Sequence, residues 1–569
     1  MNAIRKDHGH RSPSGQRGTA LVMSLFLITV LTVLGTMVLN TSIVEIKMAQ
    51  NQKISSQVFY AAEAGLERGL LMLIEDFENQ GGSAWGNATY AGWGETVTET
   101  AVTGSTTFDK DIRSLDMYTS SPDTKLKKLT LGGGHTVNNL TFDLYIYKET
   151  ADEAYVMSHA YGNGGMAAIE YHLAVEDMSP YNNAIFTGAG VSGHFQGSVN
   201  IAGSIYSRGT LNMGANVHVN NNYDDPRTGK TWASNTTLNT ILEYEADLDT
   251  KLRVQGGDLT VGASSTQVGY AGTDNSIAGI YVDGATNIDS VGTHYYDEHT
   301  NEVPDVPLPS IYDGLREVFG TAGLDLDTCI AAKSGANDAA IATSIYADWA
   351  TGTGCMSSLP SQGAVFDGDI VLDKNTADGW LVGPDVNGNG IYYDAPPSGT
   401  GMGEINIQGT AVVTGDFIFG DNKLDGLNYN ASGADIGLGS DPDNGATLYV
   451  GGNFTANGQF YPDAGYLKGT DFTPPPGDND INSLGVVTPN DVTFTGHNDD
   501  VHAGFFFADG QVNFNKQSKF AGTVIGGLVN YAQVPDVYQV PNLANHLPPG
   551  VPGGQSLVQL TSREWRRVY

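Results

Sequence analysis

The stretch that decides the fold of this chain is residues 18–44, GTALVMSLFLITVLTVLGTMVLNTSIV. It holds no charged residue and exceeds the roughly 20 apolar residues that a helix needs to span a bilayer. Residues 45–77 follow as EIKMAQNQKISSQVFYAAEAGLERGLLMLIEDF. Their apolar side chains recur mostly at three- and four-residue spacing, which indicates an amphipathic helix. Because no proline interrupts residues 19–78, we expect one continuous helix there, with an apolar membrane part at 19–44.

A short basic segment precedes the apolar run. Within residues 1–18 four basic residues stand against one acidic residue: Arg5, Lys6, Arg11 and Arg17 against Asp7. Cleavage between Gly18 and Thr19 would remove these charges and keep the apolar helix. A secretory signal peptide has the opposite order, since its apolar core of 7–15 residues lies ahead of the cleavage site. An uncleaved signal anchor is the alternative that remains.

Two motifs in this helix resemble a known family. QRGTALV at 16–22 looks like the processing site of prepilins, and EIKMAQN at 45–51, followed by FYAAEAGLE at 59–67, resembles the N-terminal domain of PilX-type minor pilins. The resemblance covers about residues 16–75. It implies that residues 1–18 are a prepilin leader, cleaved after Gly18, and that Thr19 becomes an N-methylated terminus. The motif residues are Arg17, Glu45, Met48, Ala49, Asn51, Ala61, Ala62, Glu63, Ala64 and Gly65.

One position departs from the family pattern. Major pilins carry a glutamate at the fifth mature position, which is Met23 here. In the family this glutamate pairs with the terminal amine of the subunit ahead, because a carboxylate in hydrocarbon is kept only where it has a partner. A subunit with nothing ahead of it needs no such glutamate, so Met23 suits a priming or tip subunit. The alternative is that this family tolerates the loss.

The composition of the 569-residue chain indicates several domains rich in turns and strands. Only 16 % of its residues are charged, and it contains 73 glycines, a composition typical of turn-rich β structure. The formal net charge of −35 argues against nucleic-acid binding through the body, which would need clustered lysine and arginine.

The strand patterns divide the chain after the helix (19–78). Residues 79–178 alternate in hydrophobicity and predict a small β-sheet packed on the helix. Residues 179–310 and 363–569, the latter with a C-terminal tail, consist of short strand–turn–strand units that favour a right-handed parallel β-helix in two parts. A β-sandwich stays open as the alternative. Between them, residues 311–362 predict a helical insertion that holds both cysteines. The expected fold class is α+β.

No catalytic motif stands out, so we expect a protein that is not an enzyme. His135, His159, His172 and His194 are interpreted as polar groups of strands and turns. A β-helical polysaccharide-cleaving enzyme remains the remote alternative.

One loop resembles half of a calcium site. Asp385, Asn387 and Asn389 at positions 1, 3 and 5, with Gly390 at position 6, match the first half of a calcium loop, and Asp394 follows. Position 12 is Pro396 instead of glutamate, so an Asx-rich turn without metal is the alternative. No cofactor is required, and Ca²⁺ is the one candidate.

These expectations together describe a minor pilin of a type IV pilus or related secretion filament. It would begin in the inner membrane and reach the periplasm and the extracellular filament. The resemblance implies as partners other major and minor pilins, prepilin peptidase, the inner-membrane assembly platform and a tip adhesin. The alternative is a membrane-anchored surface adhesin whose β-helix binds a glycan or a surface.

The two cysteines generate a first prediction. An exported body folds in an oxidising compartment, so Cys329 and Cys355 should form one disulfide. Closing this 26-residue span would contribute about 3 kcal/mol by the chain-entropy estimate. Mass spectrometry of alkylated, unreduced protein should show no alkylated thiol. Two alkylated cysteines would contradict the prediction.

Overall fold

The computed structural model describes most of the chain in two compact units. It describes residues 16–79, 97–101, 126–131, 136–137, 139–148, 153–192, 195, 199–225, 229, 232, 238–242, 244, 246–272, 275–321, 325–333, 337–354, 364–384, 389–397, 401–421, 424–431, 445–463, 483–531, 535–540, 547–548, 550–553 and 558–568. The first unit comprises Met1–Asp76, Asn87–Ala174 and Thr561–Tyr569, and the second comprises Phe77–Gly86 and Val175–Leu560.

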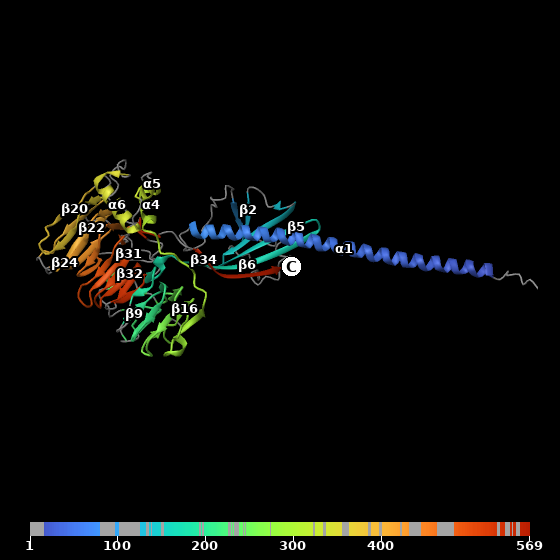
Figure 1. Cartoon of the computed structure of the whole chain (residues 1–569), viewed down its shortest axis with the longest axis horizontal. Coiled ribbons are helices and arrows are strands. Elements are labelled where there is room, and N and C mark those ends of the chain that lie inside the picture. The colour runs from blue at the N-terminus through green and yellow to red at the C-terminus, as the bar shows by residue number, and fades with distance from the viewer. Residues whose placement is uncertain are drawn as a thin grey trace, which may run out of the picture. The chain divides into compact units, whose positions relative to one another are not determined.

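The first unit pairs one long helix with a sheet (Figure 1). Helix α1 runs over Gln16–Asn79, 64 residues, or about 96 Å at 1.5 Å per residue. The sheet has the order β1-β2-β4-β5-β6-β34, with β3 paired to β4. Its strands are β1 (Val97–Ala101), β2 (Leu126–Leu131), β3 (Thr136–Val137), β4 (Leu140–Lys148), β5 (Glu153–Gly162), β6 (Gly165–Asp177) and β34 (Val558–Val568).

Strands β4, β5 and β6 form an antiparallel meander. The turn between β5 and β6 is Asn163–Gly164, with φ of 52° and 84°. Positive φ at both central residues matches the right-handed twist of the two strands. The alternation of β4 and β5 places Phe142, Leu144 and Val156 in the core.

The C-terminal tail differs from the expectation. We placed it with the second part of the body at 363–569, whereas β34 joins the first sheet beside β6. Sheet partners so far apart in sequence leave no local signal, so the strand pattern of 558–568 alone could not assign it. The body is thus an insertion between two neighbouring strands of one sheet.

The second unit is built from short strands that pair almost entirely in parallel. The strands before the helical segment are β7 (Ile185–Thr187), β8 (Val191–Ser192), β9 (Val199–Ala202), β10 (Ile205–Arg208), β11 (Leu211–Met213), β12 (Val217–Asn220), β13 (Lys251–Gln255), β14 (Leu259–Val261), β15 (Gln267–Val268), β16 (Ile277–Val282) and β17 (Tyr296–Thr300). β7, β10, β13, β16 and β17 pair in that order, each parallel to the next.

The strands after the helical segment continue the same arrangement. They are β18 (Ala364–Phe366), β19 (Ile370–Asp373), β20 (Gly379–Val382), β21 (Gly390–Asp394), β22 (Gly401–Gln408), β23 (Thr410–Val413), β24 (Phe417–Asp421), β25 (Leu424–Asn430), β26 (Ala446–Val450), β27 (Phe454–Ala456), β28 (Gln459–Pro462), β29 (Leu484–Thr488), β30 (Val492–Phe494), β31 (Val501–Phe514), β32 (Lys519–Tyr531) and β33 (Asp536–Tyr538). One ladder follows β18, β23, β26, β29, β31 and β32.

The two parts join in the middle of the stack. The last long strand, β32, pairs in parallel with the first, β7, and β33 pairs with β9. The chain therefore enters the stack at its middle and winds to one end at β17. It then crosses to the other end at β18 and winds back to the middle. Figure 1 shows this order, from β20 and β24 through β31 and β32 to β9 and β16.

A ladder of hydrogen bonds from backbone N–H groups to side chains connects successive turns of the stack. The backbone N–H of Asp416 donates to Oδ1 of Asp369 at 2.8 Å, and that of Asn453 donates to Oδ1 of Asp416 at 2.7 Å. The backbone N–H groups of Asp491 and Gln511 continue the series. We call Asp369, Asp416, Asn453, Asp491 and Gln511 the Asx ladder.

Glycine precedes four of the five ladder positions: a Cβ would clash at Gly415, Gly452 and Gly510, and Gly368 has a φ of 123° that favours glycine. A Cβ on Gly415 would lie 2.0 Å from Oδ1 of Asp369, and one on Gly452 would lie 2.2 Å from Oδ1 of Asp416. The repeated Gly–Asx pair therefore has a physical cause. The intervals between the hydrogen-bonded residues are 47, 37, 38 and 20 residues.

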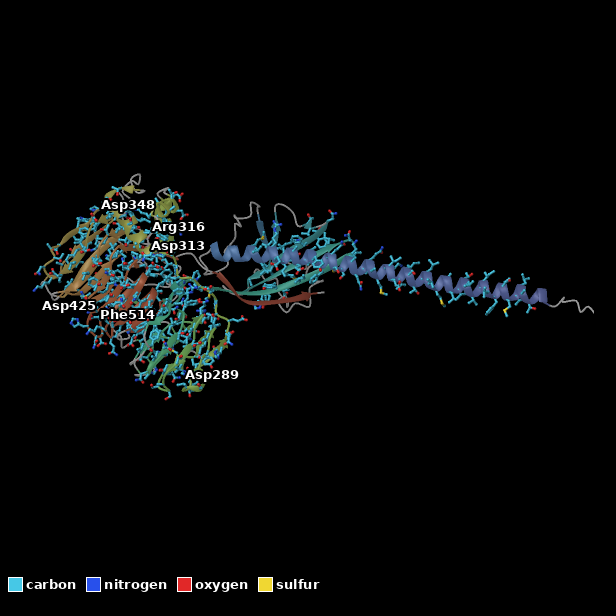
Figure 2. The ribbon with its side chains drawn as sticks, viewed as in Figure 1. Asp289, Asp313, Arg316, Asp348, Asp425 and Phe514 are labelled. Carbon is cyan, nitrogen blue, oxygen red and sulfur yellow. The ribbon has the colours of Figure 1, made fainter. Side chains whose placement is uncertain are left out.

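Aromatic side chains fill the interior of this stack. The rings of Phe494 and Phe514 stack at 5.0 Å between centroids, and those of Phe514 and Tyr531 at 5.4 Å. Phe514 lies in the body in Figure 2. Burying rings of this size supplies much of the hydrophobic stabilisation.

The described residues between β17 and β18 form three helices: α4 (Ile311–Thr321), α5 (Leu326–Ala332) and α6 (Asp338–Thr351). Tyr346 of α6 packs against Tyr449 of β26, and Thr343 Oγ1 donates to the carbonyl of Gly451. Arg316 lies next to Asp313 (Figure 2) and bonds both Asp313 and Asp327.

One polar side chain lies fully inside the aromatic core. His502 is 0 % exposed, and its ring lies 4.7 Å from that of Phe494. Neither of its ring nitrogens has a hydrogen-bond partner. Burial lowers the pKa of His502 to about 3, so the imidazole is neutral in the folded protein.

This burial predicts an acid-sensitive body. The unfolded chain binds a proton at His502 below pH ~6.5, whereas the folded chain does not until pH falls to about 3. Stability is therefore lost as pH falls through this window. His502→Leu should remove that loss, so its free energy of unfolding in urea, relative to the wild type, should grow by about 2 kcal/mol from pH 8 to pH 5. All carboxylates are common to both proteins, so an equal difference at both pH values would contradict this origin.

Candidate functional site: the N-terminal helix

The first half of α1 has no packing partner among the described residues. The large apolar side chains from Leu21 to Val44 are exposed, for example Leu25 at 65 % and Val38 at 65 %. A span of Thr19–Met72 contains a segment long and apolar enough to cross a membrane. Water-exposed apolar surface of this extent is unfavourable, so this segment needs a bilayer or other apolar helices around it.

Five hydroxyl side chains of the segment are satisfied within the helix itself: Ser24, Thr29, Thr32, Thr36 and Thr41. The hydroxyls of Thr29, Thr32 and Thr41 each donate to the carbonyl four residues earlier, at 2.7–3.0 Å. Ser24 donates to the carbonyl three residues earlier. Hydrocarbon offers no hydrogen-bond partner, and these bonds remove the need for one.

The second half of α1 packs on the sheet through a stripe of small residues. Ala61 and Ala62 are 1 % and 0 % exposed, and Gly65 and Gly69 are buried. A Cβ on Gly65 would lie 2.3 Å from Ser158 Oγ and 2.7 Å from Phe142 Cδ2. One on Gly69 would lie 2.7 Å from Val156 Cγ1. The helix therefore approaches β4 and β5 more closely than any residue with a Cβ allows.

The sheet contributes a matching glycine. A Cβ on Gly165, at the start of β6, would lie 2.7 Å from Ile54 Cγ2. The motif analysis found Gly65 but missed Gly69 and Gly165. The signal for Gly69 was its four-residue spacing from Gly65, which places both on one helix face.

The motif residues divide into two groups. Three of them face the sheet: Ala61, Ala62 and Gly65. Six are exposed on the same helix: Glu45, Met48, Ala49, Asn51, Glu63 and Ala64. The three buried residues pack against the sheet of the first unit, whereas the six exposed residues do not pack on that sheet.

The processing residues lie at the start of the helix. Gln16 is the first residue of α1, so Gly18 and Thr19 lie in its first turn. Thr19 is exposed, and Met23 is 69 % exposed within the apolar segment. Arg17 is also helical.

The other predicted sites have mixed outcomes. Cys329 is 1 % exposed and is not a free thiol, but Cys355 lies outside the described residues, so their pairing stays a prediction. His172 stacks on Tyr155 at 4.3 Å between ring centroids, and His159 packs against Tyr161. His135 and His194 lie outside the described residues.

The calcium ligand set does not come together. Asp385 and Asn387 lie outside the described residues, whereas Asn389 lies just before β21 and Asp394 ends it. An extended strand rises about 3.3 Å per residue, which separates Asn389 from Asp394 by about 16 Å. These two residues cannot bind one ion, because position 10 falls at the far end of a strand instead of in a loop. The described part of the chain holds no group of three or more His, Cys, Asp or Glu residues suited to a metal.

The close approach at Gly65 gives a third prediction. Glycine-to-alanine in a helix interior normally stabilises by up to about 1 kcal/mol, but here the added methyl overlaps Ser158 and Phe142. Gly65→Ala should therefore destabilise the first unit by about 1–3 kcal/mol. Ala64→Leu, on the exposed face one residue away, is the control and should leave stability unchanged. Thermal unfolding of the full chain in detergent measures both, and a stabilised Gly65→Ala protein would refute the contact.

Comparison with known proteins identifies the N-terminal part. The family model described as "PilX N-terminal" matches residues 17–67. No curated protein sequence matches the chain. Among solved structures, the chain is similar to the competence-associated pilin ComZ from Thermus thermophilus, with 17 % identity and a TM-score of 0.45, over 90 % of this chain and 98 % of that chain. The resemblance read from the motifs is confirmed over residues 17–67, which match the PilX N-terminal family model.

Proposed function

We propose that this chain is a minor pilin of a type IV pilus or related secretion filament. In this proposal prepilin peptidase cleaves between Gly18 and Thr19, and the mature subunit enters the filament at low copy. The observation that carries the proposal is the division of α1. Its apolar first half lacks partners in the described part of the chain, while its second half is held on a sheet by Gly65 and Gly69.

The exposed motif residues fit a role in subunit contacts. Glu45, Met48, Ala49, Asn51, Glu63 and Ala64 lie on the helix surface without packing on their own sheet. Neighbouring pilins would cover them and the apolar segment together. Before assembly, the same segment would hold the precursor in the inner membrane beside the assembly platform, with the body outside the cytoplasm.

Met23 supports a place in the priming or tip complex. It lies in the membrane segment at the position where a major pilin has its glutamate, and it offers no charge to a subunit ahead. The mature amine of Thr19 would still offer a positive partner to the next subunit. A tip position also leaves room for a large body.

We infer that the body is a parallel β-helix wound in two parts. Parallel pairing along β18, β23, β26, β29, β31, β32, β7 and β10 supports it, since a β-sandwich is built from antiparallel sheets. The exceptions in the described stack are β20–β21 and β21–β22, which pair antiparallel near one end. The handedness of the coil stays a prediction.

A surface adhesin with an uncleaved anchor is the second candidate, because the same body could bind a target. The mature N-terminus separates the two. A pilin begins at Thr19, whereas an anchored adhesin keeps its first residues.

Processing provides the test. Gly18→Leu should block cleavage, so the protein should keep the mass of its precursor in intact-mass spectrometry. Gly35→Leu is the matched control, since Gly35 lies in the same apolar helix with nothing within 4 Å of a Cβ. It should mature normally. A Gly18→Leu protein of mature mass would overturn the proposal.

A further inference from the structure

The outer face of five neighbouring strands in the body carries two rows of polar and aromatic side chains. The strands are β20, β21, β22, β25 and β28, paired in that order. Their inward residues are apolar or tyrosine and lie in the core, as Ile391, Ile405, Leu427 and Phe460 do at 0 % exposure. Alternation places the residues between them on the opposite face.

The strand register defines both rows. In the first row Trp380 lies opposite Tyr392, Tyr392 opposite Asn406, and Asn406 opposite Asn430. In the second row Asp394 lies opposite Glu404, Glu404 opposite Asn428, and Asn428 opposite Tyr461. Neighbouring members of a row are one strand apart, about 4.8 Å, which is close to the length of one pyranose unit.

The hydrogen bonds along these rows leave acceptors available. The amide nitrogen of Asn406 donates to Glu404 Oε1 at 3.1 Å, and that of Asn428 donates to Asp463 Oδ1 at 3.0 Å. The Oδ1 atoms of Asn406 and Asn428 are buried and accept no hydrogen bond. Asn406 is only 1 % exposed. Buried acceptors of this kind are normally satisfied by ordered water, so water can enter behind the half-buried Asn428 and Glu404.

The first row begins with an exposed aromatic pair. Trp380 is 39 % exposed, and its ring meets that of Tyr392 edge to face at 5.4 Å. An indole face open to solvent can stack on the C–H face of a sugar. Asp394 is exposed, and Glu404 and Asn428 are half-buried, so their side chains would form hydrogen bonds with sugar hydroxyls.

The charge of the face restricts the ligand. The five strands contain no Lys, Arg or His, whereas Asp394, Glu404 and Asp463 are acidic. Nucleic acids and acidic polysaccharides would be repelled, and the outward positions of the two rows hold no aliphatic side chain that would favour a lipid. We propose that these rows bind a glycan chain without acidic groups, laid across the strands from Trp380 towards Tyr461.

This inference extends the proposed function to a surface-binding role, but its test does not involve filament assembly. Glycan binding can therefore be disproved while the pilin assignment stands, and the pilin assignment can be disproved while glycan binding stands. The full chain, purified in a detergent without a sugar headgroup, is applied to an array of uncharged, amino-sugar and acidic glycans. The wild type should bind glycans of the first two classes. Trp380→Ala should weaken that binding about tenfold, as expected for loss of an aromatic stacking contact.

Three further variants make the result specific. Trp380→Phe should retain most of the binding, and Asn428→Ala should weaken it without removing an aromatic ring. Tyr295→Ala is the matched control, because Tyr295 is 38 % exposed in the same unit but outside the rows, and it should bind as the wild type does. Urea midpoints verify that each variant is folded. No bound glycan, binding of acidic glycans alone, or equal binding by Trp380→Ala would overturn the proposal.

Discussion

The first unit depends on the close approach of α1 to its sheet at Gly65 and Gly69. The helix has to present two different surfaces along one uninterrupted axis. Up to Val44 it is apolar all round and makes no contact with the described sheet. From Val58 onward its buried face includes a stripe of small residues, Ala61, Ala62, Gly65 and Gly69. Phe142, Leu144 and Val156 fill the space that the missing side chains leave. This contact fixes the sheet to one half of the helix and leaves the other half free to insert elsewhere.

The body follows a different constraint, which is that parallel strands joined by segments of unequal length must stay in register. The Asx ladder achieves this at one turn, because Asp369, Asp416, Asn453 and Asp491 each accept the backbone N–H of the next ladder residue. Glycine before the ladder residue provides the room. Extra residues can then leave the stack between ladder positions without disturbing the strands. Near its end the chain pairs with earlier strands: β32 pairs in parallel with β7, and β34 joins the first sheet.

The sequence predicted the N-terminal part well because its signals are local. An uncharged run and two motifs within one helix need no tertiary information, and the α+β class follows from them and from the strand alternation. The sequence analysis did not predict the Asx ladder, because its intervals vary between 47 and 20 residues and show no period. The repeated glycine–Asx pair, Gly415–Asp416 and Gly452–Asn453, was the signal that could have indicated it. The sequence could not place Asn389 and Asp394 at opposite ends of β21, because the loop pattern does not show where a strand begins. The partnership of β34 with β6 and the rows around Asn406 depend on strand register, which no single segment encodes.

The central claim is that this chain becomes a filament subunit, and the most direct measurement is its location. Filaments sheared from cells and separated from membranes should contain the protein at low copy, with Thr19 as its N-terminal residue, and immunogold labelling of the body should mark filament ends. Protein that stays entirely with the membrane fraction and retains residues 1–18, while filaments form normally without it, would contradict the account.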